Sequence, residues 1–316
     1  MDIHLVTGFL GAGKTTYIRK FSRWLRDNGQ RCAIVENEFG AANVDSAMLS
    51  ETGADVMELT GGCICCGLKV NFHDLLLALA ESGKFDCVIV EPSGIFNMDD
   101  FFEVAMSPKL KSVSRIASVI TIFSPDNAFS SENIDFSDEE AEKVICAELH
   151  STGLVLVSKT SAEDKSTHDK VKTYIGNLFD KYAVKGMTAG IPEIVMKDWD
   201  YISVEDFLKF SSACPVMRAH QNNVLKHALL FNSYMIEPTR EIEIETLNAI
   251  LAKIMAGECG FVYRVKGYVK STDAGAIEIN CADASVSTKK TIFTGRPQIN
   301  IIGKRFDRKK LNSFFR

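Results

Sequence analysis

Gly8-Phe9-Leu10-Gly11-Ala12-Gly13-Lys14-Thr15 is the stretch that decides the fold of this chain. It matches the spacing G-x-x-x-x-G-K-[ST], which is typical of a loop that binds a nucleoside triphosphate. Residues 4–7 before it are apolar enough for a short buried strand, and residues 17–27 after it have the spacing of an amphipathic helix. A plain glycine turn is the alternative, but the motif and its strand–loop–helix context agree. The sequence therefore predicts triphosphate binding.

Each position of this loop has an expected role. The glycines allow backbone N–H groups to surround a phosphate at the N-terminus of a helix, where the helix dipole favours an anion. We expect Lys14 to reach the β- and γ-phosphates and the Thr15 hydroxyl to bind Mg²⁺. The residues predicted to bind the nucleotide in this loop are Gly8, Gly11, Ala12, Gly13, Lys14, Thr15 and Thr16.

The composition limits the class of protein. A chain of 316 residues with 46% hydrophobic residues predicts two domains with sizeable cores. The net charge of −5 gives no broad positive surface for nucleic acid or an anionic membrane, and no apolar run has the length of a membrane span. The first expected strand begins so early that we expect no secretory signal. Nine cysteines, three of them clustered, suit a reducing compartment, so we expect a cytoplasmic protein.

Apolar strands alternate with helices through the first half of the chain, which predicts an α/β domain with a mostly parallel sheet covered by helices on both faces. We assign this P-loop domain to residues 1–185. Proline and glycine interrupt the pattern in 186–223, which we interpret as a linker with one short helix near 204–210. Residues 224–316 then predict a small α+β domain with a mostly antiparallel sheet, with a helix at 244–255 followed by several strands.

Acidic residues follow two of the expected strands. Glu91 ends an apolar strand, where a P-loop protein keeps the acid that holds Mg²⁺, and Gly94 can present a backbone N–H to the γ-phosphate. The loop after residues 32–37 is a candidate switch, because related enzymes have a nucleotide-responsive segment there. In or beside this loop lie Glu36, Glu38 and Asp45. We take Glu38 with Lys14 and Glu91 as catalytic and Asp45 with Thr15 and Glu91 as magnesium ligands. A solvated acidic loop is the alternative.

Cys63-x-Cys65-Cys66 is the second unusual group of residues. Flanking glycines at 61, 62 and 67 allow the backbone turn that would bring more than one sulfur to a single ion. Thiolates favour Zn²⁺ or another soft or borderline metal over Mg²⁺, and three ligands leave a fourth position open, as a metal carrier needs. Buried or incidental cysteine is the alternative, and it is the interpretation we take for the other six cysteines.

Ser158-Lys159-Thr160-Ser161 follows another apolar strand, where a GTPase normally has N-K-x-D. Lys159 is in register to pack over the base. Ser161 cannot supply the carboxylate that accepts two hydrogen bonds from guanine, so we expect weaker discrimination between GTP and ATP.

Five motifs together resemble the CobW-type family of P-loop GTPases, metallochaperone or metal-insertase proteins related to the urease and hydrogenase nickel chaperones. They are GFLGAGKTT at 8–16, ENEFG at 36–40, GGCICC at 61–66, EPSG at 91–94 and FVYRVKG at 261–267. By resemblance, Cys63, Cys65 and Cys66 would bind the transferred metal, with Glu36 as a further ligand. The chain departs from the family pattern at Ser161 and in having no histidine-rich stretch.

The resemblance implies a GTPase that delivers a transition metal, zinc or cobalt, to a client metalloprotein, with Mg²⁺ as the nucleotide's cofactor. We expect a monomer or weak homo-oligomer. Three alternatives stay open: a nucleotide-gated maturation factor for a cobalt or corrinoid enzyme with structural cysteines, an ATP-preferring nucleoside triphosphatase, and an ATP-dependent kinase of a small molecule.

Overall fold

The structure is a computed structural model of the 316-residue chain. It describes residues 1–9, 11–36, 55–58, 69–92, 98–125, 139–161, 163–182, 192–215, 232–282, 285–292 and 296–316. These residues fall into two compact units, one holding those up to 215 and the other those from 232 onward.

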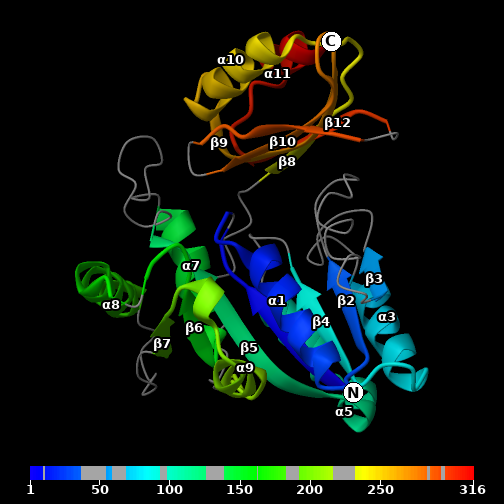
Figure 1. Ribbon diagram of the computed structural model, residues 1–316, viewed down its shortest axis with the longest axis vertical. Coiled ribbons are helices and arrows are strands. Elements are labelled where there is room, and N and C mark those ends of the chain that lie inside the picture. The colour runs from blue at the N-terminus through cyan, green and yellow to red at the C-terminus, as the bar shows by residue number, and fades with distance from the viewer. Residues whose placement is uncertain are drawn as a thin grey trace. The chain divides into compact units, whose positions relative to one another are not determined.

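The first unit is built on a seven-stranded sheet in the order β3-β2-β4-β1-β5-β6-β7 (Figure 1). Every pairing in it is parallel. The strands are β1 (Asp2–Thr7), β2 (Cys32–Glu36), β3 (Asp55–Glu58), β4 (Cys87–Glu91), β5 (Arg115–Phe123), β6 (Leu154–Val157) and β7 (Glu193–Met196). Because all strands run the same way, their carboxyl ends meet at one edge, where ligands of such sheets bind.

Helices cover both faces of this sheet. They are α1 (Lys14–Asp27), α3 (Lys69–Glu81), α4 (Met98–Ala105), α5 (Pro108–Val113), α7 (Glu139–Ser151), α8 (Lys165–Tyr182), the short 3₁₀ helix η2 (Trp199–Tyr201) and α9 (Val204–Ser211). Apolar residues of α1 and α9 pack in one cluster with one face of the strands. Residues of α3, α4 and α5 form a second cluster with the opposite face. The predicted α/β fold class is therefore confirmed.

The structure places ordered elements within 186–223, the stretch that the sequence predicts as a linker. Strand β7 pairs with β6 as the edge of the parallel sheet, and α9 packs in the first unit through the buried side chains of Phe207 and Phe210. A capping box starts α9, since Ser203 and Asp206 each bind the other's backbone amide. The described part of this stretch thus belongs to the first unit. The domain boundaries themselves remain a prediction.

The second unit has a five-stranded sheet in the order β11-β10-β9-β12-β8, and its pairings are antiparallel. This confirms the predicted mostly antiparallel α+β unit. Its elements are β8 (Asn232–Ile236), α10 (Ile244–Met255), β9 (Phe261–Ser271), β10 (Gly275–Ala282), β11 (Thr288–Thr291), β12 (Gln298–Lys304) and α11 (Arg308–Phe315).

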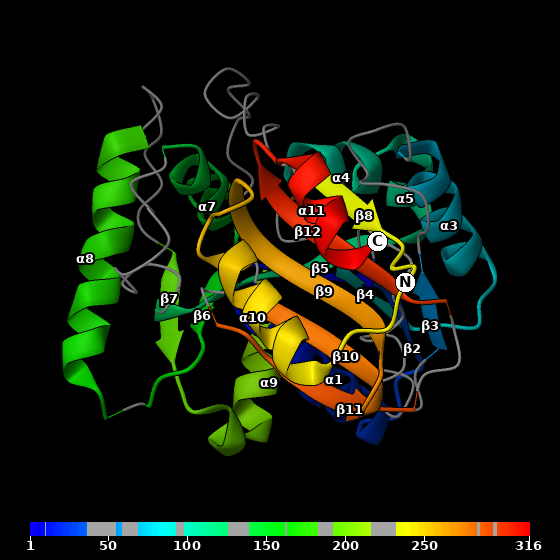
Figure 2. The same cartoon turned by 90° about the horizontal axis from the view of Figure 1, so that it is seen from above.

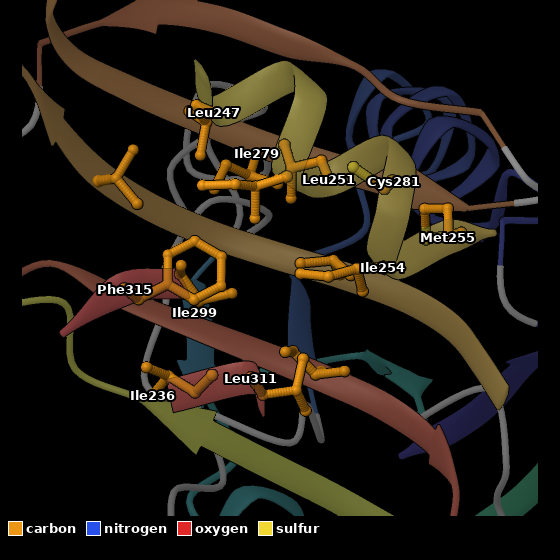
Figure 3. Close-up of a cluster of buried hydrophobic side chains, with 14 of the residues drawn as sticks. Ile236, Leu247, Leu251, Ile254, Met255, Ile279, Cys281, Ile299, Leu311 and Phe315 are labelled. Atoms are coloured by element: carbon orange, nitrogen blue, oxygen red, sulfur yellow. The ribbon is translucent and has the colours of Figure 1, made fainter. Parts of the chain in front are cut away.

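Helices α10 and α11 lie on the same face of this second sheet (Figure 2). Their apolar side chains, among them Leu247, Leu251 and Phe315, meet Ile279 and Ile299 of the strands in one buried core (Figure 3). The second unit therefore has a hydrophobic core of its own. Among the helices that the structure describes, none combines the length and apolarity required to cross a membrane.

Candidate functional site

The loop after β1 adopts a conformation that its glycines make possible. Gly8 has φ +141° and Gly13 has φ +99°, values that L side chains rarely adopt. A Cβ atom on Gly8 would lie 2.2 Å from the carbonyl oxygen of Ile122 in β5. Gly13 then precedes α1, whose first backbone N–H groups have no partner within the helix. This is the geometry in which a helix N-terminus accepts a phosphate.

Lys14 begins α1 and folds back over its own loop. Its Nζ donates to the carbonyl oxygens of Gly8, at 2.8 Å, and Phe9, at 3.3 Å, and its side chain is buried. The ammonium group is therefore already located inside the loop. Of the other predicted nucleotide ligands here, Ala12 is buried and Thr16 is exposed in the first turn of the helix.

Thr15, in the first turn of α1, and Glu91, at the end of β4, come together. Strand β4 lies beside β1, and the Thr15 hydroxyl donates to Glu91 Oε1 at 3.1 Å, with Oε2 at 3.4 Å. Hydroxyl and carboxylate oxygens suit Mg²⁺, which prefers hard oxygen ligands. Glu36 ends β2 and is the partner of Glu91 in the β2–β4 register. A second glutamate, which is buried, therefore lies at the same edge of the sheet.

Several predicted site residues lie outside the described residues: Glu38, Asp45, Cys63, Cys65, Cys66 and Gly94. Within the part of the chain that the structure describes, no group of three or more histidine, cysteine, aspartate or glutamate side chains could hold a metal ion. The other six cysteines are free thiols, five of them buried. Burial raises the pKa of Cys146 to about 12, which keeps that thiol protonated and unreactive.

The loop after β6 is attached directly to the phosphate loop. The Ser158 hydroxyl donates to the Ala12 carbonyl oxygen at 2.7 Å. Lys159 follows with φ +54°, and Ser161 is exposed at the same edge of the sheet. Asp164, the nearest aspartate, receives hydrogen bonds from the Thr167 amide and hydroxyl, at 3.0 and 2.6 Å, in the first turn of α8. This carboxylate already accepts hydrogen bonds from Thr167, so it does not take the place of the aspartate that a GTPase normally has at position 161.

Two residues that sequence reasoning missed also contact the phosphate loop. The Trp199 ring lies against Gly13, since a Cβ on that glycine would be 3.1 Å from Trp199 Cη2. Trp199 also packs edge-on against Tyr17 of α1 at 6.1 Å between ring centroids. Nothing local in the sequence pairs Trp199 with a loop far earlier in the chain, and only the position of β7 brings it there.

Glu148 is the second residue that was missed, and it lies behind the loop. Its carboxylate is buried and accepts a hydrogen bond from the Thr7 hydroxyl at 2.8 Å. Burial raises the pKa of Glu148 to about 7, against the smaller opposing effects of Lys14, Thr7 and the Gly8 amide. A signal did exist, because Glu148 interrupts the apolar side of α7 between Ile145 and Leu149.

A family model described as the CobW/HypB/UreG nucleotide-binding domain matches residues 2–184, more than half of the chain. Among curated relatives, the zinc chaperone YeiR of Escherichia coli is 31% identical over 141 residues, 44% of this chain and 43% of YeiR. The zinc chaperone CobW of Sinorhizobium sp. is 30% identical over 185 residues, 51% of each chain. The match therefore spans about half of these relatives' length.

Comparison with solved structures gives matches at lower identity. The Zn(II)-bound YjiA GTPase of Escherichia coli is 16% identical, with 100% of this chain and 98% of that chain covered and a TM-score of 0.38. HypB of Helicobacter pylori in complex with nickel is 16% identical, with 66% and 83% covered and a TM-score of 0.38. The family match over residues 2–184 carries the assignment, and the chain belongs to the CobW/HypB/UreG nucleotide-binding domain family.

Proposed function

We propose that this protein is a GTP-hydrolysing metallochaperone, which couples a nucleotide cycle to the transfer of zinc or cobalt to a client metalloprotein. The observation that carries the nucleotide part is the contact between the Thr15 hydroxyl and the Glu91 carboxylate at the end of β4. It brings a phosphate-loop threonine and an acidic strand end together, as a magnesium–triphosphate site requires.

In the nucleotide site, Lys14 would neutralise charge on the β- and γ-phosphates, and the amides at the start of α1 would hold the phosphate oxygens. Thr15 and Glu91 would hold Mg²⁺, with Asp45 as a further candidate ligand, and this ion supplies charge neutralisation during phosphoryl transfer. Glu38 and Gly94 are proposed to orient water and the γ-phosphate. Because such chemistry relies on positioning, intrinsic turnover is expected to be slow without a partner.

The transferred metal is proposed to bind Cys63, Cys65 and Cys66, with Glu36 as a further ligand. Support comes from the chemistry of the residues, since thiolates select borderline and soft metals, and from the printed names of the relatives YeiR and CobW as zinc chaperones. Glu36 ends β2 beside Glu91, so this metal and the nucleotide would both act on the segment that follows β2. Shared use of one segment is a physical route for coupling.

Two variants test this function together. Lys14→Ala should abolish hydrolysis and weaken triphosphate binding, because the ammonium inside the loop is lost. Cys65→Ser combined with Cys66→Ser should weaken Zn²⁺ and Co²⁺ binding and remove the thiolate-to-Co²⁺ charge-transfer absorption. Phosphate release and nucleotide titration measure the first variant, and metal titrations of the purified protein, with and without GTP and Mg²⁺, measure the second. Normal turnover in Lys14→Ala would contradict the proposed nucleotide site. Unchanged metal affinity in the cysteine variant would contradict the proposed metal site.

An ATP-preferring nucleoside triphosphatase is the second candidate, and Ser161 favours it. Introducing the carboxylate with Ser161→Asp should raise the GTP-to-ATP affinity ratio by roughly tenfold or more, since an aspartate can accept two hydrogen bonds from guanine. Competition between the two nucleotides for a fluorescent analogue measures the ratio. If it does not change, base selection lies elsewhere in the site.

A further inference from the structure

The carboxylate of Glu148 is the most unusual group next to the phosphate loop. Glu148 lies on α7 and is only 1% exposed. The Thr7 hydroxyl, at the end of β1, donates to its Oε1 at 2.8 Å, and the neighbouring Gly8 amide also stabilises the charged carboxylate. The two residues that Glu148 holds are therefore the last of the strand and the first of the loop.

A second contact fixes α7 in this position. The Thr121 hydroxyl of β5 donates to the backbone carbonyl oxygen of Glu148 at 3.3 Å. Glu148 is thus held by β5 through its main chain and by β1 through its side chain. A side chain fixed in this way is suited to hold a loop in one position.

One residue, Gly8, connects Glu148 to Lys14. Its amide stabilises the charged Glu148 carboxylate, while its carbonyl oxygen accepts from Lys14 Nζ at 2.8 Å. Helix α7 packs against α4, α8 and β5. Among the charged and titratable side chains that the structure describes on those elements and on α1, Lys14 is the one that acts on this carboxylate. The Lys14 charge therefore stabilises the charged form of Glu148.

We propose that Glu148 is a positioning residue of the nucleotide site, which balances the Lys14 charge while the loop is empty and takes up a proton when a triphosphate binds. This inference rests on the proposed nucleotide function. A triphosphate brings several negative charges against Lys14 and Gly8, and the same two residues stabilise the Glu148 carboxylate. Like charges close together in a buried site disfavour the second charge, so the carboxylate should protonate.

The direction of the pH effect follows. Burial already raises the pKa of Glu148 to about 7 in the folded protein, and a bound triphosphate should raise it further. Between these two pKa values binding takes up a proton, so triphosphate affinity falls as the pH rises, by at most about tenfold per pH unit. Below the lower pKa the group is protonated in both states and contributes no pH dependence.

Glu148→Gln is the informative variant. The amide keeps the size of the side chain and an oxygen that can accept from Thr7, but it has no proton to exchange. The variant should bind the triphosphate with an affinity that does not fall through this pH range. Above pH about 7 it should bind more tightly than the wild type, by up to about tenfold per pH unit.

Isothermal titration calorimetry with a non-hydrolysable GTP analogue and saturating Mg²⁺ tests the proposal. Titrations at about pH 7.5 in two buffers of different ionisation enthalpy give the protons taken up, and wild type should exceed Glu148→Gln by more than about half a proton. Because the nucleotide titrates identically with both proteins, the difference belongs to Glu148. Glu142→Gln, on the same helix but bound to Lys181 and Tyr182, is the matched control and should behave like wild type.

Thr7→Val provides a second measurement. Removing the hydroxyl that stabilises the charged carboxylate should leave Glu148 already protonated near neutral pH, so the proton uptake should decrease. Equal proton uptake in the wild type and Glu148→Gln, with tight binding in both, overturns the role of Glu148 and leaves the nucleotide function standing. Wild-type protein that binds no nucleotide at any pH overturns both.

Discussion

Gly8 occupies a position that a residue with a side chain does not fit. Its φ of +141° belongs to a region that L side chains avoid, and the position of its missing Cβ is taken by the Ile122 carbonyl. The carbonyl oxygen of Gly8 accepts a hydrogen bond from Lys14, and its amide stabilises the charged Glu148 carboxylate. At this scale, the nucleotide site depends on single atoms of one backbone unit.

His4 predicts a pH dependence of folding. It is buried on β1, with Nδ1 2.8 Å from the Ser118 hydroxyl, and burial lowers the pKa of its ring to about 4. Because the folded pKa lies below the unfolded value of 6.5, His4 contributes stability above pH 6.5 that is lost as the pH falls toward 4. Between pH about 7 and about 4.5, wild type should lose about 2 kcal/mol more stability than His4→Gln.

Urea unfolding of both proteins at the two pH values measures this difference. Comparison of variants is needed because Glu148 acts in the opposite direction. Its folded pKa of about 7 lies above the ordinary glutamate value of 4.5, so its contribution to stability is lost as the pH rises from 4.5 to 7. If wild type and His4→Gln lose equal stability on acidification, His4 is not neutral in the folded protein.

Helix α9 shows what packing decides at the scale of an element. The Phe210 ring is fully buried and lies 6.2 Å from Tyr17 between centroids, so α9 shares the core on one face of the parallel sheet with α1. The residues of α9 were predicted as a short helix. Its place in the first unit was not, because 186–223 has the composition of a linker.

Phe210→Ala should destabilise the first unit by about 3 to 5 kcal/mol, because it leaves a cavity in that core. Leu208→Ala on the same helix is the control. Leu208 is 56% exposed, and its loss should cost less than about 1 kcal/mol. Denaturant unfolding measures both, and equal small losses would mean that α9 does not belong to the core.

The local pattern predicted some elements closely and others not at all. Helix α10 occupies 244–255 as expected, because apolar residues recur at helical spacing. The sequence pattern did not predict strand β7, because the strand is short and its side chains are exposed or only partly buried. What places β7 in the sheet is backbone pairing with β6, which no local pattern records.

At the scale of the whole molecule, each of the two units has hydrophobic packing of its own. Residues of the first unit pack on the two faces of the parallel sheet, and those of the second pack between α10, α11 and the antiparallel sheet. Each unit should therefore unfold with its own stability.

Leu251→Ala should lower the melting transition of the second unit by the equivalent of about 2 to 5 kcal/mol, since Leu251 is fully buried on α10. The transition that Phe210→Ala lowers should not move. Scanning calorimetry distinguishes them, with the exposed Lys253→Ala on the same helix as the control. A single transition that both core variants lower equally would argue against independent units.

The sequence by itself determined the phosphate loop, the helix after it, the alternation of strands and helices and the acid at the end of β4. These features depend on residues close together in the chain, whose spacing matches the period of a helix or strand. Only the tertiary structure decided that Glu148 lies behind Thr7, that Trp199 covers Gly13 and that β7 completes the sheet. Those contacts join segments far apart in the chain, and they follow from the order in which the strands pair.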